Sequence, residues 1–190
     1  GSRKKKKAPR RIRTVGDNCL IGASGEYSDF QSVMDTLEGM VQDDVNYDDG
    51  EKSDAKSIHS YLRAVMYQRR SKMNPLWNDI IIAGKDFLGY VDKIGTTYED
   101  SFIATGFGSY LAIPILRSKW RPDLTEGEAR ALLEDCLRVL FYRDCRALNR
   151  IQIAKVQGDD DAVVSDPYEL ETNWSGFEAT KGDMDGDGGW

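Results

Sequence analysis

The chain contains few of the residues that most catalytic and metal sites require. Among its 190 residues are one histidine, His59, and three cysteines, Cys19, Cys136 and Cys145. The cysteines are far apart and form no CxxC pair, which indicates neither a disulfide framework nor a zinc site, so we expect three buried thiols. His59 lies in a helical pattern without a companion catalytic motif, and we expect it on a helix face rather than in a Ser–His or Cys–His pair.

Long apolar runs are also missing. No stretch approaches the ~18 apolar residues that a membrane span needs, and no short apolar segment resembles the core of a signal peptide. The sequence therefore predicts a protein of the cytoplasm and nucleus with no membrane partner. Its length, with 40% hydrophobic and 31% charged residues, suits one globular domain.

Acidic residues are absent from residues 3–13, which carry eight of the 26 lysines and arginines. The remaining chain has 18 basic against 32 acidic residues, a balance of −14. A basic run of this kind can bind nucleic acid or direct nuclear import, but it is more often a solvated segment. Because the rest of the chain is acidic, we expect no nucleic-acid partner.

Hydrophobic periodicity predicts a strand and two helices before residue 75. Residues 19–22 indicate a buried strand that ends at glycine, and Ser28 with Gln31 has the spacing of a capping box. The first helical stripe then comprises Phe30, Val33, Met34, Leu37, Met40 and Val41. The acidic run 43–54 is interpreted as a loop that ends this helix. A second stripe comprises Ile58, Tyr61, Leu62, Val65 and Met66, and its helix stops before Asn74-Pro75.

Short strands and two further helices are predicted after residue 78. The segments 80–84, 87–91 and 102–106 indicate an antiparallel meander rather than βαβ units. A third helix begins near Phe107 and is expected to be kinked or cut short by Pro114. Thr125 and Glu128 form a capping-box pattern for a helix whose apolar face comprises Ala129, Leu132, Leu133, Cys136, Leu137 and Leu140. Residues 150–156 and 162–165 close the pattern as strands.

Six motifs follow one another along the chain: VGDNCLIGASGEYSDFQ (15–31), YQRRSKMNPLWN (67–78), FLGYVDKIG (87–95), ATGFGSYLA (104–112), LRVLFYRDCRALNRIQIAKV (137–156) and ETNW (171–174). In this order they resemble the motifs of the proteasome beta-type subunits, and in particular the subunit type at the seventh position of the beta ring. The resemblance implies an α+β fold, a four-layer αββα sandwich of the N-terminal nucleophile hydrolase type. It also implies that the chain is a non-catalytic structural subunit of a hetero-oligomer of 28 alpha and beta subunits. That particle degrades ubiquitin-tagged proteins.

The resemblance also implies a division of the chain. Residues 1–13 form a basic segment, 14–178 the beta-type domain, and 179–190 an acidic Gly/Asp tail that we expect to be flexible. The first two strands of the family's domain, which would carry the N-terminal threonine, are expected to be missing.

Catalytic members of this family use that threonine as the nucleophile, with its amine and a lysine handling the proton. Arg11 falls at the position of the lysine, and a guanidinium does not release its proton. Phe107 and Ala147 replace two serines of the family's site, and only the aspartate Asp144 is retained. For Asp144 we expect a structural role, at the helix end or paired with Arg143 or Arg146. No catalytic residue is therefore predicted.

Two groups of residues are predicted to contact other subunits. The helix-to-strand corner supplies Arg69, Arg70, Met73, Pro75 and Trp77, as the resemblance implies. The C-terminal extension leaves the sandwich in this family, and its predicted contact residues are Thr172, Asn173, Trp174 and Phe177. Aromatic anchors in such a polar tail gain free energy when they are buried against a partner.

Other interpretations stay open. Asp183, Asp185, Asp187 and Gly188 have the spacing that opens an EF-hand, but the twelfth-position glutamate is missing, so we predict neither a metal nor another cofactor. A hydrolase that uses Ser2 after loss of Gly1 is a second possibility. A degenerate hydrolase-fold subunit that acts as a binding module through its basic arm is a third.

Overall fold

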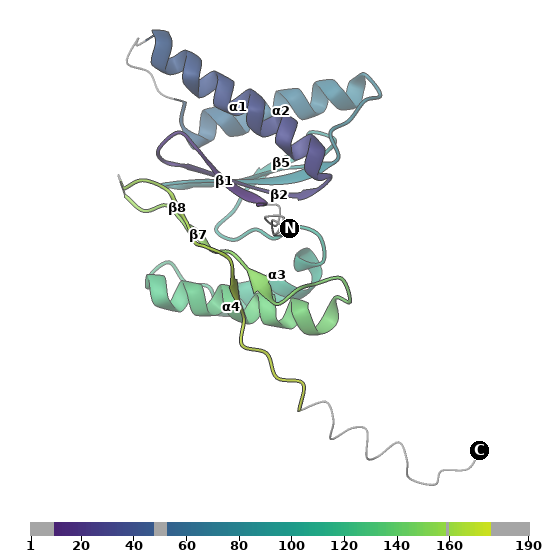
Figure 1. Cartoon of the computed structure of the whole chain (residues 1–190), viewed down its shortest axis with the longest axis vertical. Coiled ribbons are helices and arrows are strands. Elements are labelled where there is room, and N and C mark those ends of the chain that lie inside the picture. Colours follow the sequence, from purple (N-terminus) through teal and green to yellow (C-terminus); the bar gives the residue numbers. More distant parts are fainter. Residues whose placement is uncertain (1–9, 48–52, 159, 176–190) are drawn as a thin grey trace, which may run out of the picture.

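The computed structural model describes residues 10–47, 53–158 and 160–175, which form an α+β fold (Figure 1). Ser2, Phe177, the basic residues 3–7 and the acidic motif 183–188 lie outside the described residues. The central sheet is antiparallel, with the order β1 (Ile12–Val15), β2 (Cys19–Gly25), β3 (Asn78–Gly84), β4 (Phe87–Val91) and β5 (Thr97–Glu99). β1 begins at Ile12, two residues before the start of the beta-type domain inferred from the resemblance. The predicted antiparallel meander is therefore confirmed for its strands at 80–84 and 87–91, but not for its third strand.

Helices α1 (Tyr27–Tyr47) and α2 (Ala55–Ser71) lie together on one face of this sheet (Figure 1). Side chains alternate along a strand, so β3 directs Ile80 and Ile82, both fully buried, to one face. That face contacts the buried helical residues Phe30, Val33, Met34, Leu37, Ile58, Leu62 and Met66. Both predicted helical stripes are confirmed. Burial of each such side chain favours folding by ~1.5–3 kcal/mol, which makes this cluster the main core.

His59 belongs to the same packing. It is 7% exposed, its Nε2 lies 3.1 Å from the carbonyl oxygen of Tyr90, and its ring packs edge-on against Phe87. A buried polar group with a hydrogen-bond partner of this kind stabilises a core. The histidine therefore joins α2 to β4, on the helix face that was predicted.

The two ends of α1 differ from the prediction. Glu26, rather than Ser28, caps the helix, because the Glu26 carboxylate accepts hydrogen bonds from the Ser28 N–H (3.4 Å) and hydroxyl (3.1 Å). A carboxylate in this position also interacts favourably with the helix dipole. At the other end the helix continues to Tyr47, so residues 43–47 of the acidic run are helical rather than a loop.

A second, smaller core lies between helices α3 (Gly108–Lys119) and α4 (Glu126–Arg143). It is formed by Ala112, Leu116, Leu132 and Cys136. Pro114 lies inside α3 and does not shorten it, which corrects part of the prediction. The capping box of α4 is confirmed, since the Thr125 side chain accepts from the Glu128 N–H and Glu128 accepts in return from the Thr125 N–H. Leu133 is 43% exposed and does not belong to the buried face.

Short strand pairs lie between the sheet and the α3–α4 layer (Figure 1). They are β6 (Arg150–Ile151) with β9 (Tyr168–Glu169), and β7 (Ala154–Lys155) with β8 (Val163–Val164). Strands were predicted within 150–156 and 162–165, which is confirmed.

Three other predictions were wrong. β2 continues past Gly22 to Gly25, residues 102–106 form no strand, and Cys145 is exposed. The last β-strand of the meander lies instead at residues 97–99, where Tyr98 stacks on Tyr90. Cys19 and Cys136 are buried as expected.

Candidate functional site

The corner between α2 and β3 has a well-defined helix-ending geometry. The N–H of Asn74 donates to the carbonyl of Arg69 (3.0 Å), and the N–H of Met73 donates to the carbonyl of Arg70 (3.1 Å). This pair of bonds is a Schellman motif, which satisfies carbonyls that a helix end would otherwise leave free. Met73 occupies the left-handed position of the motif, at φ +55°.

Met73 is an unusual residue for this position. Glycine is the common choice, because a side chain in the left-handed region costs about 1 kcal/mol or more. Its side chain is also 91% exposed, so it gains almost nothing from packing within the chain. Neither the backbone nor the core of this protein explains a methionine here.

Other apolar and basic side chains surround Met73, and together residues 67–77 with 93 and 94 form what we call the corner surface. Tyr67, Trp77 and Ile94 are each more than half exposed. The Arg70 guanidinium lies 5.6 Å from the centre of the Tyr67 ring, and the Lys93 ammonium lies 5.7 Å from that of Trp77. A shallow hollow of about 540 Å³ is lined by Arg70, Ser71, Met73 and Pro75. The predicted contact residues of the corner therefore lie on one surface; Arg69 is half-buried beneath it.

The corner surface rests on a rigid junction with the start of α1. The carbonyl of Trp77 accepts from the N–H of Glu26 (2.9 Å), and the N–H of Trp77 donates to the Asp29 carboxylate (2.9 Å). Gly25 lies at φ +92°, and a Cβ there would be 2.0 Å from the Trp77 carbonyl oxygen. The buried Asn78 completes the junction, since its Nδ2 donates to the carbonyls of Ser24 (3.0 Å) and Glu26 (2.8 Å). Trp77 is thus exposed on a fixed backbone.

Sequence reasoning did not assign these junction residues. Gly25, Glu26 and Asp29 fall in one of the recognised motifs and Asn78 ends another, so their place in the motifs was the available signal. Their pairing joins positions about fifty residues apart, which no local pattern reveals.

Arg11, at the position of the family's lysine, is held by main-chain carbonyls. Its Nη1 donates to the carbonyl of Gly25 (3.0 Å) and lies 3.5 Å from that of Ala23. The guanidinium also lies 5.7 Å from the centre of the Tyr27 ring. These contacts tie the start of β1 to the end of β2 and leave Arg11 as a permanent cation.

The family's catalytic site has three further positions in this chain, Phe107, Asp144 and Ala147. They lie where the start of α3 meets the end of α4. Phe107 precedes α3 and is 60% exposed. Asp144 ends α4, where its Oδ1 accepts from the N–H of Arg146 (2.9 Å) and its carbonyl accepts from the N–H of Ala147 (3.0 Å). These bonds fit the predicted helix-end role of Asp144.

Of the predicted C-terminal contact residues, those that the structure describes lie against the end of α4. Trp174 packs against Tyr142 and Phe141, with ring centres 4.8 and 5.7 Å apart, yet it remains 49% exposed. Asn173 exchanges main-chain hydrogen bonds with the Tyr142 hydroxyl at 2.6 and 3.0 Å. Thr172 is half-buried beside them. Figure 1 places this segment next to α4, at the opposite end of the molecule from α2.

A cavity of about 840 Å³ lies between the end of α1, the start of α2 and two strand turns. The thiol of Cys19 lines it, and burial, with a smaller effect of the Asp54 charge, raises the pKa of this thiol to about 12. A thiol that stays protonated is a poor nucleophile. Within residues 10–47, 53–158 and 160–175, no cluster of metal-binding side chains occurs and no helix is suited to span a membrane.

Comparison with known proteins agrees with the motifs. The family described as proteasome subunit matches residues 1–156. A proteasome subunit beta type-4 of Arabidopsis thaliana is 46% identical over 178 residues, which cover 92% of this chain and 72% of that protein. The beta type-4 subunit of Xenopus laevis is 47% identical over 180 residues, with coverages of 88% and 74%. The beta type-7 subunit of Saccharomyces cerevisiae is 36% identical over 189 residues, with coverages of 90% and 70%.

These matches confirm the resemblance drawn from the sequence motifs, including its narrower assignment to a single type of beta subunit. The family match covers most of the 190 residues, and the relatives match along almost the whole chain. The chain therefore belongs to the proteasome subunit family, among its beta-type members.

Proposed function

We propose that this chain is a non-catalytic structural beta subunit of the 20S proteasome core particle. It occupies the beta type-4 position, seventh in the ring, and helps to enclose the proteolytic chamber. Its partners are alpha and beta subunits in a 28-subunit particle, in the cytoplasm and nucleus. The identities of 46% and 47% to two beta type-4 subunits support this position.

The state of Arg11 is the observation that carries the non-catalytic assignment. A lysine at this position could exchange a proton with a nucleophile, whereas the Arg11 guanidinium keeps its charge and donates to the Gly25 carbonyl at 3.0 Å. Phe107 and Ala147 offer no hydroxyl to support the reaction. Of the family's four site positions, Arg11, Phe107 and Ala147 thus differ from the catalytic pattern, and only Asp144 keeps it.

A four-layer αββα arrangement of the fold forms part of this proposal. The α1–α2 and α3–α4 pairs would be the outer layers, with the five-stranded sheet and the short pairs β6–β9 and β7–β8 as the inner ones (Figure 1). The corner surface and the segment of Thr172, Asn173, Trp174 and Phe177 would contact neighbouring subunits.

Native mass spectrometry on the complex that carries this chain tests the proposal. The complex is purified through a tag on the C-terminus, and we expect two copies of the chain in a particle of alpha and beta subunits. A second measurement replaces Arg11 by alanine and assays peptide cleavage by the particle. Peptidase activity unchanged from wild type supports a non-catalytic role. Recovery of the chain as a free monomer, or loss of a peptidase activity from a variant particle that assembles as wild type does, would contradict the proposal.

A further inference from the structure

We infer that Met73 is the anchor by which the corner surface docks into another subunit, and that the partner presents an apolar pocket bordered by carboxylates. The inference rests on the proposed function and specifies one of its contact sites. Met73 occupies a position where glycine is favoured, at φ +55°, and its side chain is 91% exposed. A side chain that opposes the local conformation, and that the described part of its own chain leaves almost fully exposed, contributes through contact with a partner.

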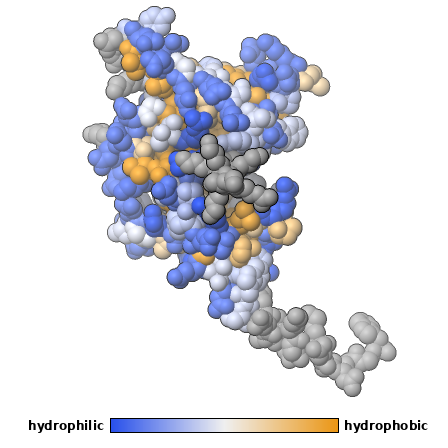
Figure 2. Space-filling view, in the orientation of Figure 1, coloured by the Kyte–Doolittle hydropathy of each residue, from blue (hydrophilic) through white to orange (hydrophobic). Residues whose placement is uncertain are grey.

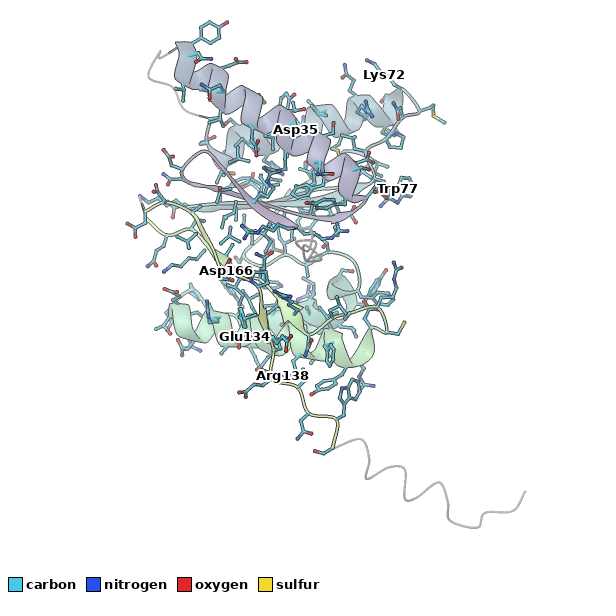
Figure 3. All side chains as sticks on the ribbon, viewed as in Figure 1. Asp35, Lys72, Trp77, Glu134, Arg138 and Asp166 are labelled. Atoms are coloured by element: carbon cyan, nitrogen blue, oxygen red, sulfur yellow. The ribbon has the colours of Figure 1, made fainter. Side chains whose placement is uncertain are left out.

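Exposed apolar surface surrounds Met73. Pro75 and Met73 line the hollow of about 540 Å³, and Tyr67, Trp77 and Ile94 add exposed apolar surface on the same corner. In Figure 3, Lys72 and Trp77 lie on the same side of the molecule. Figure 2 shows the surface of one face of the molecule, on which hydrophobic patches are scattered among hydrophilic residues. Flexible methionine side chains and aromatic rings are typical centres of protein interfaces.

The backbone beneath the corner surface is held in place by contacts with neighbouring elements. Trp77 is held through the N–H of Glu26 and the carboxylate of Asp29, and the Gly95 turn packs directly against Tyr67. A rigid surface loses little conformational entropy when a partner binds. Trp77 and Tyr67 therefore lie on backbone that needs little rearrangement when a partner binds.

The charges of the corner surface identify the chemistry of the partner. Arg70 and Lys72 are exposed at the end of α2, and neither forms an ion pair with any of the described residues. The nearby carboxylates are already engaged, since Asp79 pairs with Lys93 (3.6 Å) and Asp92 accepts from the N–H groups of Ile94 and Thr96. The corner is locally cationic on a chain whose net charge is −6. A carboxylate-bordered pocket complements it.

The first test replaces Met73 by glycine in the full-length chain. Cells express the tagged variant together with an untagged wild-type copy, and the share of each in the purified particle is measured by mass spectrometry. We expect the Met73→Gly chain to enter the particle about tenfold less than wild type, as for loss of an interface anchor. Its urea midpoint should equal or exceed that of wild type, because glycine suits the left-handed position.

Matched variants separate the side chain from the backbone. Met73→Asn places a residue that tolerates the left-handed region but removes the apolar group. This variant should therefore enter the particle as poorly as Met73→Gly. Met73→Leu keeps the apolar group and should enter within about twofold of wild type. Val45→Ala removes apolar surface from a side chain that is 65% exposed on α1. This control variant should enter the particle as often as wild type.

A charge test addresses the partner. Lys72→Glu should reduce incorporation more than Lys72→Gln, because reversal adds repulsion from the partner's carboxylates. Arg63→Glu, an exposed change on the same helix, should have little effect. Equal incorporation of Met73→Gly and wild type would overturn the inference and leave the proposed function standing, as would Lys72→Glu competing like wild type. Absence of the wild-type chain from the particle would instead contradict the proposed function itself.

Discussion

At the scale of single residues, Gly25 sets the junction that supports the corner surface. Its φ of +92° favours glycine, and a Cβ there would lie 2.0 Å from the carbonyl oxygen of Trp77. We expect Gly25→Ala to lower the free energy of unfolding of the chain by ~3 kcal/mol or more, because both strain and a backbone clash oppose the change. Urea denaturation followed by circular dichroism measures the loss.

Gly39 provides the matched control for that substitution. It lies within α1, and a Cβ there would meet nothing within 4 Å. Gly39→Ala should therefore raise the free energy of unfolding by up to ~1 kcal/mol, since alanine favours the helix. A similar effect of the two alanine substitutions would show that the junction around Gly25 does not constrain the fold.

Glu128 makes stability depend on pH. Hydrogen bonds from the Thr125 N–H and hydroxyl, with a further bond from Arg121, lower the pKa of this carboxyl from 4.5 to about 2. A lowered pKa means that the ionised form is preferred in the folded chain, so its stabilisation is present above pH 4.5 and is lost as the pH falls from there towards 2. In Glu128→Gln, urea midpoints should decline less steeply over this interval than in wild type. Identical slopes for the two proteins would contradict the prediction.

At the scale of elements, α4 shows which of two adjacent leucines supports the α3–α4 core. Leu132 is 7% exposed within the core, whereas Leu133 is 43% exposed. We expect Leu132→Ala to reduce the free energy of unfolding by ~2–4 kcal/mol through a cavity. Leu133→Ala should change it by less than ~1 kcal/mol, because little burial is lost and alanine is a better helix former. Equal losses would place both leucines in the core.

Element prediction succeeded where one local rule decided the outcome. The Thr125–Glu128 capping box opened α4 as expected, because both halves of the motif lie within four residues. At α1 the Ser28–Gln31 pattern was misleading, since Glu26 provides the cap and the two motifs compete within three residues. Residues 102–106 have strand composition, but β5 at residues 97–99 takes the place beside β4, and Phe102 and Ala104 pack against the α3–α4 core instead.

The candidate site could be predicted only in part. The motif containing residues 67–78 identified the corner, and Arg69, Arg70, Met73, Pro75 and Trp77 indeed lie along it. The left-handed conformation of Met73 could not be foreseen, because the sequence offers no glycine to mark it. The same holds for the contact of Gly25 with Trp77, which depends on the register of β2 against β3.

At the scale of the whole molecule, the two hydrophobic cores predict two levels of stability. The core beneath α1 and α2 includes Phe30, Met34, Ile58, Leu62, Ile80 and Ile82, all nearly inaccessible to solvent. The α3–α4 core is smaller, and the short pairs β6–β9 and β7–β8 lie between it and the sheet (Figure 1). Less buried apolar surface means a lower free energy of local opening.

Native-state hydrogen exchange on the free chain tests this order. Amides of α3 and α4 should exchange through an opening of lower free energy than those of β2, β3 and α2. Leu132→Ala should lower the opening free energy of α3 and α4 while amides of β3 keep theirs, because Leu132 belongs to the second core. If all amides exchanged with one common free energy, the two cores would form a single cooperative unit. If α3 and α4 open first, as predicted, a partner that binds them would raise their free energy of opening more than that of the sheet. Binding to the folded form stabilises the elements that would otherwise open first.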